Sequence, residues 1–328
     1  MTSCYRLGAT DSGPINEGEN DMQSHVRMFC VGFLAVISAG CESTRWNWLK
    51  REPANDVAVK PGDSHTVTGL VDYLNDNAKR VRTFRVDDLA VDATVDNQPV
   101  GLRGRIFAEK PRNFRMKVTF AGKDEVDIGS NQHEFWFWAA KNPDKYQYFC
   151  SYKDLNEGRV KMMPLPIQPE WVLESLGLGP YGPAEKYHLE PSGPTDPLLR
   201  LVEKTKSPQG YPVRKVIVMN RKEVKSPQPQ VTAYLLLDDA TGNEICSARI
   251  TATALDRATG AIIPYKMELR MPTQKMTMTL KLDGISVNGK IADTAFVRQP
   301  IAGAEAFNLA TGRTEPWGFQ RAGGLNPK

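Results

Sequence analysis

Apolar and polar residues alternate with a period of two in several segments of this chain, and no other feature constrains the fold as strongly. The alternation is clearest at 114–120, 263–271 and 276–282. Successive side chains of a β-strand point to opposite faces, so each segment predicts a strand with one face on a core and the other in water. A change of parity at Asp87 or Asp88, inside a further strand-like segment, predicts a β-bulge.

Turn residues separate these segments and predict an antiparallel meander. The near-repeats DDATGN at 238–243 and DRATGA at 256–261 place Gly242 and Gly260 where a tight turn requires a positive φ. Parallel neighbours would need crossover helices, and no stretch of helical period between residues 213 and 282 is long enough to supply one.

Only two or three short helices are expected. Apolar residues recur at steps of three and four from 66 to 81, which predicts an amphipathic helix of about four turns. A second helix fits 169–176, between Pro169 and Gly177, and a third, shorter one fits 197–204. About ten or eleven strands then have too few helices to cover their apolar faces, so the sheet of this mainly β (α+β) chain must curl on itself. A sandwich, a closed barrel and a half-open barrel all satisfy this requirement.

The N-terminal part of the chain predicts an exported, membrane-anchored protein. The uninterrupted apolar run at 28–40 has thirteen residues, too few for a bilayer-spanning helix of about 20. It is typical of a signal peptide, expected over 1–40 with a true start at Met22. The run ends in Ala39-Gly40-Cys41, which resembles a bacterial lipobox and predicts lipidation of Cys41, although Ser38 stands where such motifs prefer Leu. Secretion with a free cysteine is the alternative.

The rest of the chain divides into three parts. Residues 42–62 contain two prolines and no sustained period, so they are expected to be a tether between anchor and domain. The folded domain is expected over 63–300, followed by a flexible tail at 301–328. Against 42 Lys and Arg stand 38 Asp and Glu, and the resulting charge of +4 is too small and too dispersed for a nucleic-acid binder.

Two cysteines fall within the predicted domain. Of the five in the chain, Cys4 and Cys30 would leave with the signal peptide and Cys41 would carry lipid. Cys150 and Cys246 then either form a disulfide, if their strands are close, or remain two separate buried thiols.

An aromatic segment and several methionines are the most unusual apolar features. In EFWFW at 134–138, Phe135 and Phe137 would face one side of a strand and Trp136 and Trp138 the other, so both sides must be covered. Either one side lines the interior while the other meets a lid or a partner, or this is a central strand between the core and the helix at 66–81. The predicted inner faces are also rich in methionine, which suits varied apolar ligands but equally an ordinary core. These methionines are Met116, Met267, Met271, Met276 and Met278, with Met162 and Met163 near the predicted second helix.

Several motifs together resemble a known family. A strand followed by KPxxFR (Lys110, Pro111, Phe114, Arg115) leads into a Gly129-Ser130-Asn131 turn, the aromatic strand and the segment PLPIQPEWVLESLGL. With the lipobox and the helix at 66–81, this order resembles the LolA/LolB-like outer-membrane lipoprotein-sorting superfamily over about residues 64 to 300. The resemblance implies a curved antiparallel meander that forms an unclosed β half-barrel, with two or three helices plugging its concave side. It implies a cavity for the acyl chains of lipids or lipoproteins, and a lid.

The sequence predicts a non-enzymatic function. His65, His133 and His188 do not stand in zinc-site spacings, and the chain lacks the nucleophile-elbow, Walker and dinucleotide glycine motifs, so no catalytic residue, metal or cofactor is expected. We expect a lipid-anchored bacterial envelope protein, facing the periplasm on the outer membrane, that binds acyl chains for lipid or lipoprotein transport or reception. The alternative is an envelope scaffold or interaction module with a filled core that binds partner proteins. The residues expected to form the cavity and lid are Phe114, Met116, Val118, Met267, Leu269, Met276, Met278 and Leu280, with Trp171, Leu173 and Leu176 in the lid.

Overall fold

The computed structural model describes residues 65–95, 98–160, 163, 169–191, 193 and 195–316. The predicted signal peptide, Cys41, the tether at 42–62, Met162 and the end of the tail lie outside the described residues. Among the described residues, no helix is long and apolar enough to cross a bilayer.

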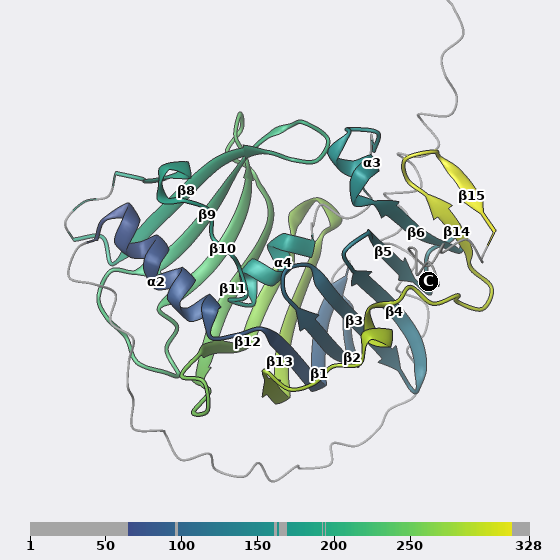
Figure 1. Cartoon of the computed structure of the whole chain (residues 1–328), viewed down its shortest axis with the longest axis horizontal. Helices are drawn as coiled ribbons and strands as arrows, with labels where there is room; N and C mark the ends of the chain where they lie inside the picture. The colour runs from purple at the N-terminus through teal and green to yellow at the C-terminus, as the bar shows by residue number, and fades with distance from the viewer. Residues whose placement is uncertain are drawn as a thin grey trace, which may run out of the picture.

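One open sheet of fifteen strands dominates the described part of the chain (Figure 1). The first six strands are β1 (Thr83–Val95), β2 (Gln98–Glu109), β3 (Asn113–Phe120), β4 (Lys123–Ser130), β5 (Glu134–Ala139) and β6 (Tyr146–Ser151). The next seven are β7 (Tyr187–Leu189), β8 (Leu198–Lys206), β9 (Pro212–Asn220), β10 (Val231–Asp238), β11 (Glu244–Leu255), β12 (Ile262–Met271) and β13 (Met276–Val287). The last two are β14 (Glu305–Asn308) and β15 (Arg313–Glu315).

The strand order shows that the sheet is an unclosed half-barrel. It runs β15-β14-β6-β5-β4-β3-β2-β1-β13-β12-β11-β10-β9-β8-β7, so the first and last strands of the long meander, β1 and β13, are neighbours at its centre. Every pair is antiparallel except β14 with β6. The two edges, β15 and β7, do not pair with each other. The predicted meander and half-barrel are confirmed.

Local sequence explains the bends and turns of this sheet. The register of β1 against β2 shifts between Val86 and Leu89, which confirms the predicted bulge. Gly242 and Gly260 have φ of 74° and 69°, as the turns require. The two near-repeats share a mechanism, because in each the leading aspartate accepts hydrogen bonds from the amide and the hydroxyl of the threonine three residues later.

Two helices lie on the concave side of the sheet, which faces the viewer in Figure 1. Helix α2 (Val67–Lys79) begins at Thr66, whose hydroxyl caps the amide of Gly69, and buries Leu70, Val71 and Leu74. Helix α4 (Pro169–Ser175) has proline in its first turn and ends before Gly177, whose φ is 78°. Both predicted helices are confirmed. A third helix, α3 (Tyr152–Asn156), was not predicted, and its Tyr152 and Leu155 are buried.

The helix expected at 197–204 is wrong, because this segment is β8. Leu199 and Leu201 point to the concave core, whereas Val202 packs with Val216 on the opposite face. A strand that is apolar on both faces loses its period of two, and a short apolar run of that kind cannot be told from a buried helix by periodicity.

The C-terminal segment after β13 crosses the convex face instead of forming only a tail. Arg115 has the opposite parity to Phe114 and Val118, and its guanidinium pairs with Asp127 at 2.7 Å. The same guanidinium donates hydrogen bonds to the carbonyl oxygens of Ala295 and Val297. Further on, β14 pairs with β6, and β15 pairs with β14, within the region expected to be flexible. The Ala- and Gly-rich composition hid these short strands.

Candidate functional site

The strand residues predicted to line a cavity all lie in one apolar cluster on the concave side, which we call the lid cluster. Phe114, Val118, Met267 and Leu280 are buried in it. The other four are partly buried and pack against it: Met116, Leu269, Met276 and Met278. Met271 is also buried in the cluster. They come from β3, β12 and β13, which the sheet order places on both sides of β1 and β2.

The predicted lid residues fill the space in front of these strands. We call α4 together with Leu176 the lid. Its Trp171, Leu173 and Leu176 are 4%, 3% and 3% exposed and belong to the same apolar cluster as the strand residues. The structure therefore brings the strand residues and the helix residues that the sequence predicted for one site into the same apolar cluster.

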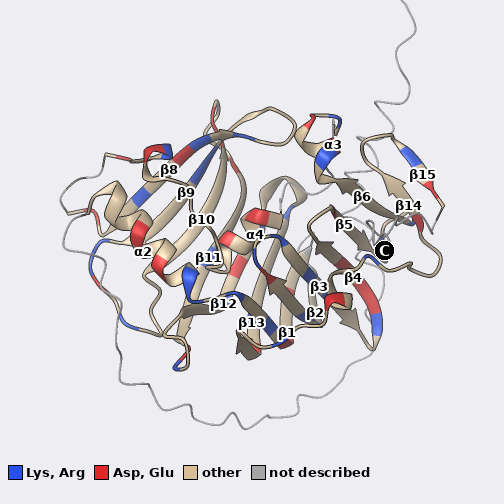
Figure 2. Ribbon diagram, viewed as in Figure 1, with Lys and Arg blue, Asp and Glu red and all other residues tan. Residues whose placement is uncertain are grey.

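Two ion pairs connect the lid to two separate parts of the sheet, the β2–β3 turn and β9. Glu170 accepts a hydrogen bond from Arg112, in the turn between β2 and β3, at 2.8 Å. Glu174 contacts the ammonium of Lys215, on β9, at 3.1 and 3.4 Å. Figure 2 shows acidic residues on α4, in red, at the centre of the concave side. The lid thus joins β2–β3 to β9 through charged side chains.

The segment after the lid is fixed by tyrosines and an asparagine. The hydroxyls of Tyr181 and Tyr234 are 2.7 Å apart, and Tyr181 also donates to the carbonyl oxygen of Glu174. Asn75 of α2 bonds both the amide and the carbonyl of Tyr181. Helix α2 and the lid are therefore linked through one buried tyrosine.

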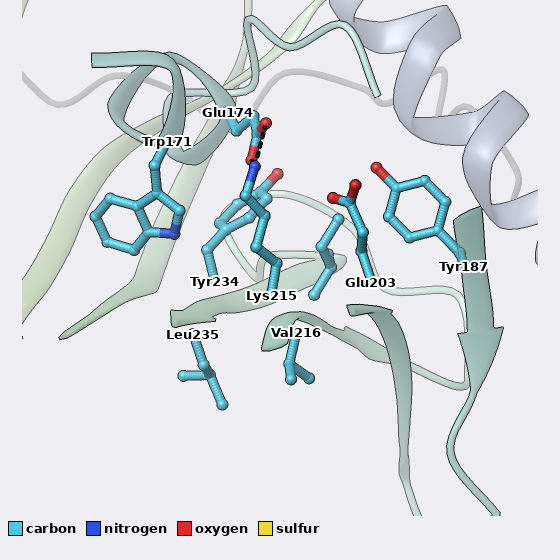
Figure 3. Close-up of a pocket in the computed structure, with 9 residues that line it drawn as sticks. Trp171, Glu174, Tyr187, Glu203, Lys215, Val216, Tyr234 and Leu235 are labelled. Atoms are coloured by element: carbon cyan, nitrogen blue, oxygen red, sulfur yellow. Dashed lines mark hydrogen bonds and ion pairs between the residues drawn. The ribbon is translucent and has the colours of Figure 1, made fainter. Parts of the chain in front are cut away.

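A small pocket lined by charged and apolar residues lies beneath the lid (Figure 3). Glu174 reaches down to Lys215, while Glu203 lies opposite both Tyr187 and Lys215 in the strand register. Trp171, Ile217 and Tyr234 also line it, whereas the side chains of Val216 and Leu235 point away from Glu174 and Lys215.

The pocket is closed by side chains in this structure. Its free volume is ≈ 10 Å³, and a second pocket between α2 and β10–β12 has ≈ 40 Å³. One water needs about 10–15 Å³ on this scale, so these two spaces hold one and about three waters. Neither holds an acyl chain unless the lid moves.

Burial governs the protonation of the groups beneath the lid. It raises the pKa of the Glu174 carboxyl, an effect that the nearby ammonium of Lys215 opposes. It also raises the pKa of Tyr187, Tyr181 and Tyr234 well above the ordinary value and that of Tyr73 to about 12. The tyrosine hydroxyls therefore stay protonated and act only as neutral hydrogen-bonding groups near pH 7.

The aromatic strand lies apart from the lid cluster. Phe135 packs with Cys150, Tyr152 and Leu155 in a separate cluster beneath α3. Phe137 shares its face and stacks on Tyr148 at 5.0 Å.

On the other face of the aromatic strand, Trp136 packs with Phe149 and Ala306. Trp138, which shares that face, is 9% exposed. The strand is thus covered on both sides, as predicted, but the covering elements are α3 and the C-terminal segment. Helix α2 does not cover it, because β5 lies near the opposite end of the sheet from the strands that α2 covers.

Cys150 and Cys246 are free and buried. They lie on β6 and β11, with β5, β4, β3, β2, β1, β13 and β12 between them in the sheet. Neighbouring strands of a sheet lie about 5 Å apart, so two cysteines separated by this many strands are too far apart to form a disulfide. Of the two alternatives left open by the sequence, the structure has two separate thiols.

The sequence reasoning missed the polar part of the site. Glu174, Lys215, Tyr181 and Tyr234 were not singled out. One signal was present, because Lys215 has the same parity as Ile217 and Met219 and so occupies an inward position.

Comparisons with known proteins find structural similarity at very low sequence identity. No family model and no curated protein matches the chain. A DUF1329 family protein from Desulfovibrio piger has 8% identity and a TM-score of 0.44, with 70% of this chain and 95% of that chain covered. A domain named for outer membrane lipoprotein sorting, from Vibrio parahaemolyticus, has 9% identity and a TM-score of 0.44, with 69% and 95% covered. A LolA superfamily protein from Nitrosomonas europaea has 11% identity and a TM-score of 0.42, with 70% and 97% covered. These similarities include the superfamily that the sequence resembles, and they concern the fold, not the function.

Proposed function

We propose that this protein binds the acyl chain of a lipid or lipoprotein in the space that the lid occupies, and that it does so without catalysis. One observation supports this most directly. Trp171, Leu173 and Leu176 share one apolar cluster with the inward residues of β3, β12 and β13. A short helix of seven residues, which makes two ion pairs, shares the concave side of the sheet with α2.

The energies of lid displacement and acyl binding are of similar size. Exposing the three lid side chains costs about 2–3 kcal/mol each, or about 7 kcal/mol together. Burial of a long acyl chain offers on the order of 10 kcal/mol, at about 0.8 kcal/mol per CH₂ and before ordering costs. The acyl chain and the lid therefore compete for the same apolar surface with comparable free energies, which suits a protein that must also release its ligand.

The proposed setting is the bacterial envelope. The predicted signal peptide and the lipobox-like Ala39-Gly40-Cys41 support a lipid-anchored protein that faces the periplasm, and the resemblance to the lipoprotein-sorting superfamily favours the outer membrane. In this setting the acyl ligand is a lipid or lipoprotein in transit between membranes, and the protein receives or transports it.

A second candidate function is an envelope scaffold with a permanently filled core. The observation that favours it is the small free volume of the two pockets, ≈ 10 and ≈ 40 Å³. A scaffold would bind partner proteins through its outer surfaces and would carry no lipid.

Native mass spectrometry of residues 42–328, secreted and purified without detergent, tests the two candidates. Acyl binding predicts a bound lipid or acylated peptide at near one per chain, or uptake of a fluorescent fatty acid. A bare mass without uptake would contradict it and favour the scaffold.

A matched pair of variants tests the place of binding. Met278 is partly buried and faces the lid cluster, whereas Thr277, its neighbour on β13, points to the other face. Met278→Arg should abolish uptake of the fatty acid and Thr277→Arg should not. Equal uptake by both variants would place the ligand elsewhere.

A further inference from the structure

Lys215 places a positive charge on the concave face of β9. Ile217 and Met219 of the same strand are buried in the lid cluster, and alternation puts Lys215 on their side. Its side chain is 23% exposed. An ammonium removed from water needs an anion as partner, and in the closed structure that partner is the carboxylate of Glu174 on the lid.

The pocket around Lys215 is continuous with the lid cluster. Trp171, Ile217 and Tyr234 line the pocket and belong to the apolar cluster as well. The site therefore has a charged group at one end and an apolar volume at the other. This is the shape of an amphiphile with an acyl chain and a polar head.

We propose that the acyl ligand is a long-chain carboxylate, and that its head group takes the position of the Glu174 carboxylate on Lys215 when the lid moves away. The inference rests on the proposed acyl binding and names the ligand class. The closed structure already shows the required geometry, with carboxylate oxygens 3.1 and 3.4 Å from the Lys215 nitrogen. Glu174 thus holds the position of the ligand while the site is empty.

Lys215 is the one ammonium among the described residues that line the pocket, so it is the group on which an anionic head can bind. Glu203 is the register neighbour of Lys215, and within the described residues no ion pair joins the two. In the closed state the pocket contains one ammonium and the carboxylates of Glu174 and Glu203. A ligand carboxylate restores this arrangement after the lid leaves. A neutral ester cannot replace the hydrogen bonds that Lys215 makes to the Glu174 carboxylate.

The experiment compares two ligands that differ only in the head, palmitate and methyl palmitate, by their displacement of a fluorescent fatty acid. Affinities are measured for the wild-type protein, Lys215→Met, Lys215→Arg and Glu174→Gln. The control variant is Lys204→Met, because Lys204 lies on β8 and is 63% exposed. The ratio of the two affinities is the readout, since any change in lid opening affects both ligands equally.

We expect the wild-type protein to bind palmitate about tenfold or more tightly than the ester, the factor expected for one charge-assisted hydrogen bond. Lys215→Met should remove this preference, whereas Lys215→Arg and Lys204→Met should keep it. Glu174→Gln should bind both ligands more tightly and keep or enlarge the preference, because Lys215 loses its internal partner.

The outcomes separate this inference from the proposed function. Equal binding of acid and ester by the wild-type protein, or a preference that survives in Lys215→Met, would overturn the assignment of the head-group site while acyl binding stands. Binding of neither ligand by any variant would overturn acyl binding, and this inference with it. If Lys215→Met does not fold, Lys215→Gln replaces it. The head-group assignment then requires that Lys215→Gln loses the preference for palmitate and that Lys215→Arg keeps it.

Discussion

Trp171→Ala should strengthen acyl binding while it weakens the fold. Trp171 is 4% exposed and is the largest side chain of the lid. Opening the lid costs about 7 kcal/mol by the estimate above, and removal of the indole takes about 3 kcal/mol from that cost. The open fraction then rises about 100-fold. Because apparent affinity scales with the population of the binding-competent state, the dissociation constant for palmitate should fall by about the same factor.

The matched control is Trp136→Ala. Trp136 is fully buried, but it lies on the convex face with Phe149 and Ala306, outside the lid cluster. Truncating either tryptophan should cost about 3–5 kcal/mol of unfolding free energy, measured by urea denaturation. Only Trp171→Ala should gain affinity for palmitate. If a truncation prevents folding, the pair Trp171→Phe and Trp136→Phe makes the same comparison with smaller effects.

The acyl-chain length of the ligand distinguishes lid opening from binding in the cavity that Trp171→Ala creates. An indole-sized hole holds octanoate but not palmitate, whereas an opened lid exposes the whole cluster and admits both chains. Because lid opening raises the binding-competent population for every ligand, the gain in Trp171→Ala should be the same factor for octanoate and palmitate. Equal affinities in the two tryptophan variants, or a gain confined to octanoate, would refute a displaceable lid.

Three further predictions concern the frame that positions the site. Arg115→Met should cost about 3–5 kcal/mol of unfolding free energy, because Asp127 is 1% exposed and keeps an uncompensated charge. The double variant with Asp127→Leu should recover much of this loss. A double variant as unstable as the single one would contradict the prediction. On β2, Gly104→Ala should be destabilising by more than 1 kcal/mol, since a Cβ there would lie 2.3 Å from a carbonyl oxygen of β3, whereas Gly101→Ala meets nothing within 4 Å and should be tolerated. Similar melting temperatures for both glycine variants would argue against this register. Burial raises the pKa of the Cys150 and Cys246 thiols to about 12. Peptide mapping after alkylation at pH 8 should therefore find both cysteines unmodified until the protein is unfolded. Rapid modification of either cysteine would show that its strand is accessible.

The strands and their inner faces could be predicted because side-chain direction in a strand is a local property. Phe114 and Val118 on β3, and Leu280 on β13, face the core as their alternation indicates. The prediction failed where both faces are apolar, as at Val202 on β8. Burial of both faces removes the alternation, and the position of a strand in the sheet then decides its pattern.

Pairings between distant segments could not be predicted. The contact of β14 with β6 joins residues more than 150 apart in parallel, and neither strand carries a signal for the other. The two cysteines illustrate the same limit, because both lie in correctly predicted strands whose separation depends on the order of the whole sheet. Local patterns determine which elements form, whereas the sheet order determines which of them meet.

The pair formed by Lys215 and Glu174 shows how the two kinds of information combine. The parity that Lys215 shares with the buried Ile217 and Met219 already implies a charge on the apolar face that needs a partner. Only the closed lid identifies that partner, 41 residues away in the chain. A partly buried ion pair is a costly way to attach a helix, because two apolar side chains of similar volume would hold it equally well or better. An attachment through charges has one property that apolar contacts lack, since the partner can be exchanged for another carboxylate. The choice of charged residues at this contact therefore fits a lid that opens in exchange for its ligand better than it fits a permanently filled core.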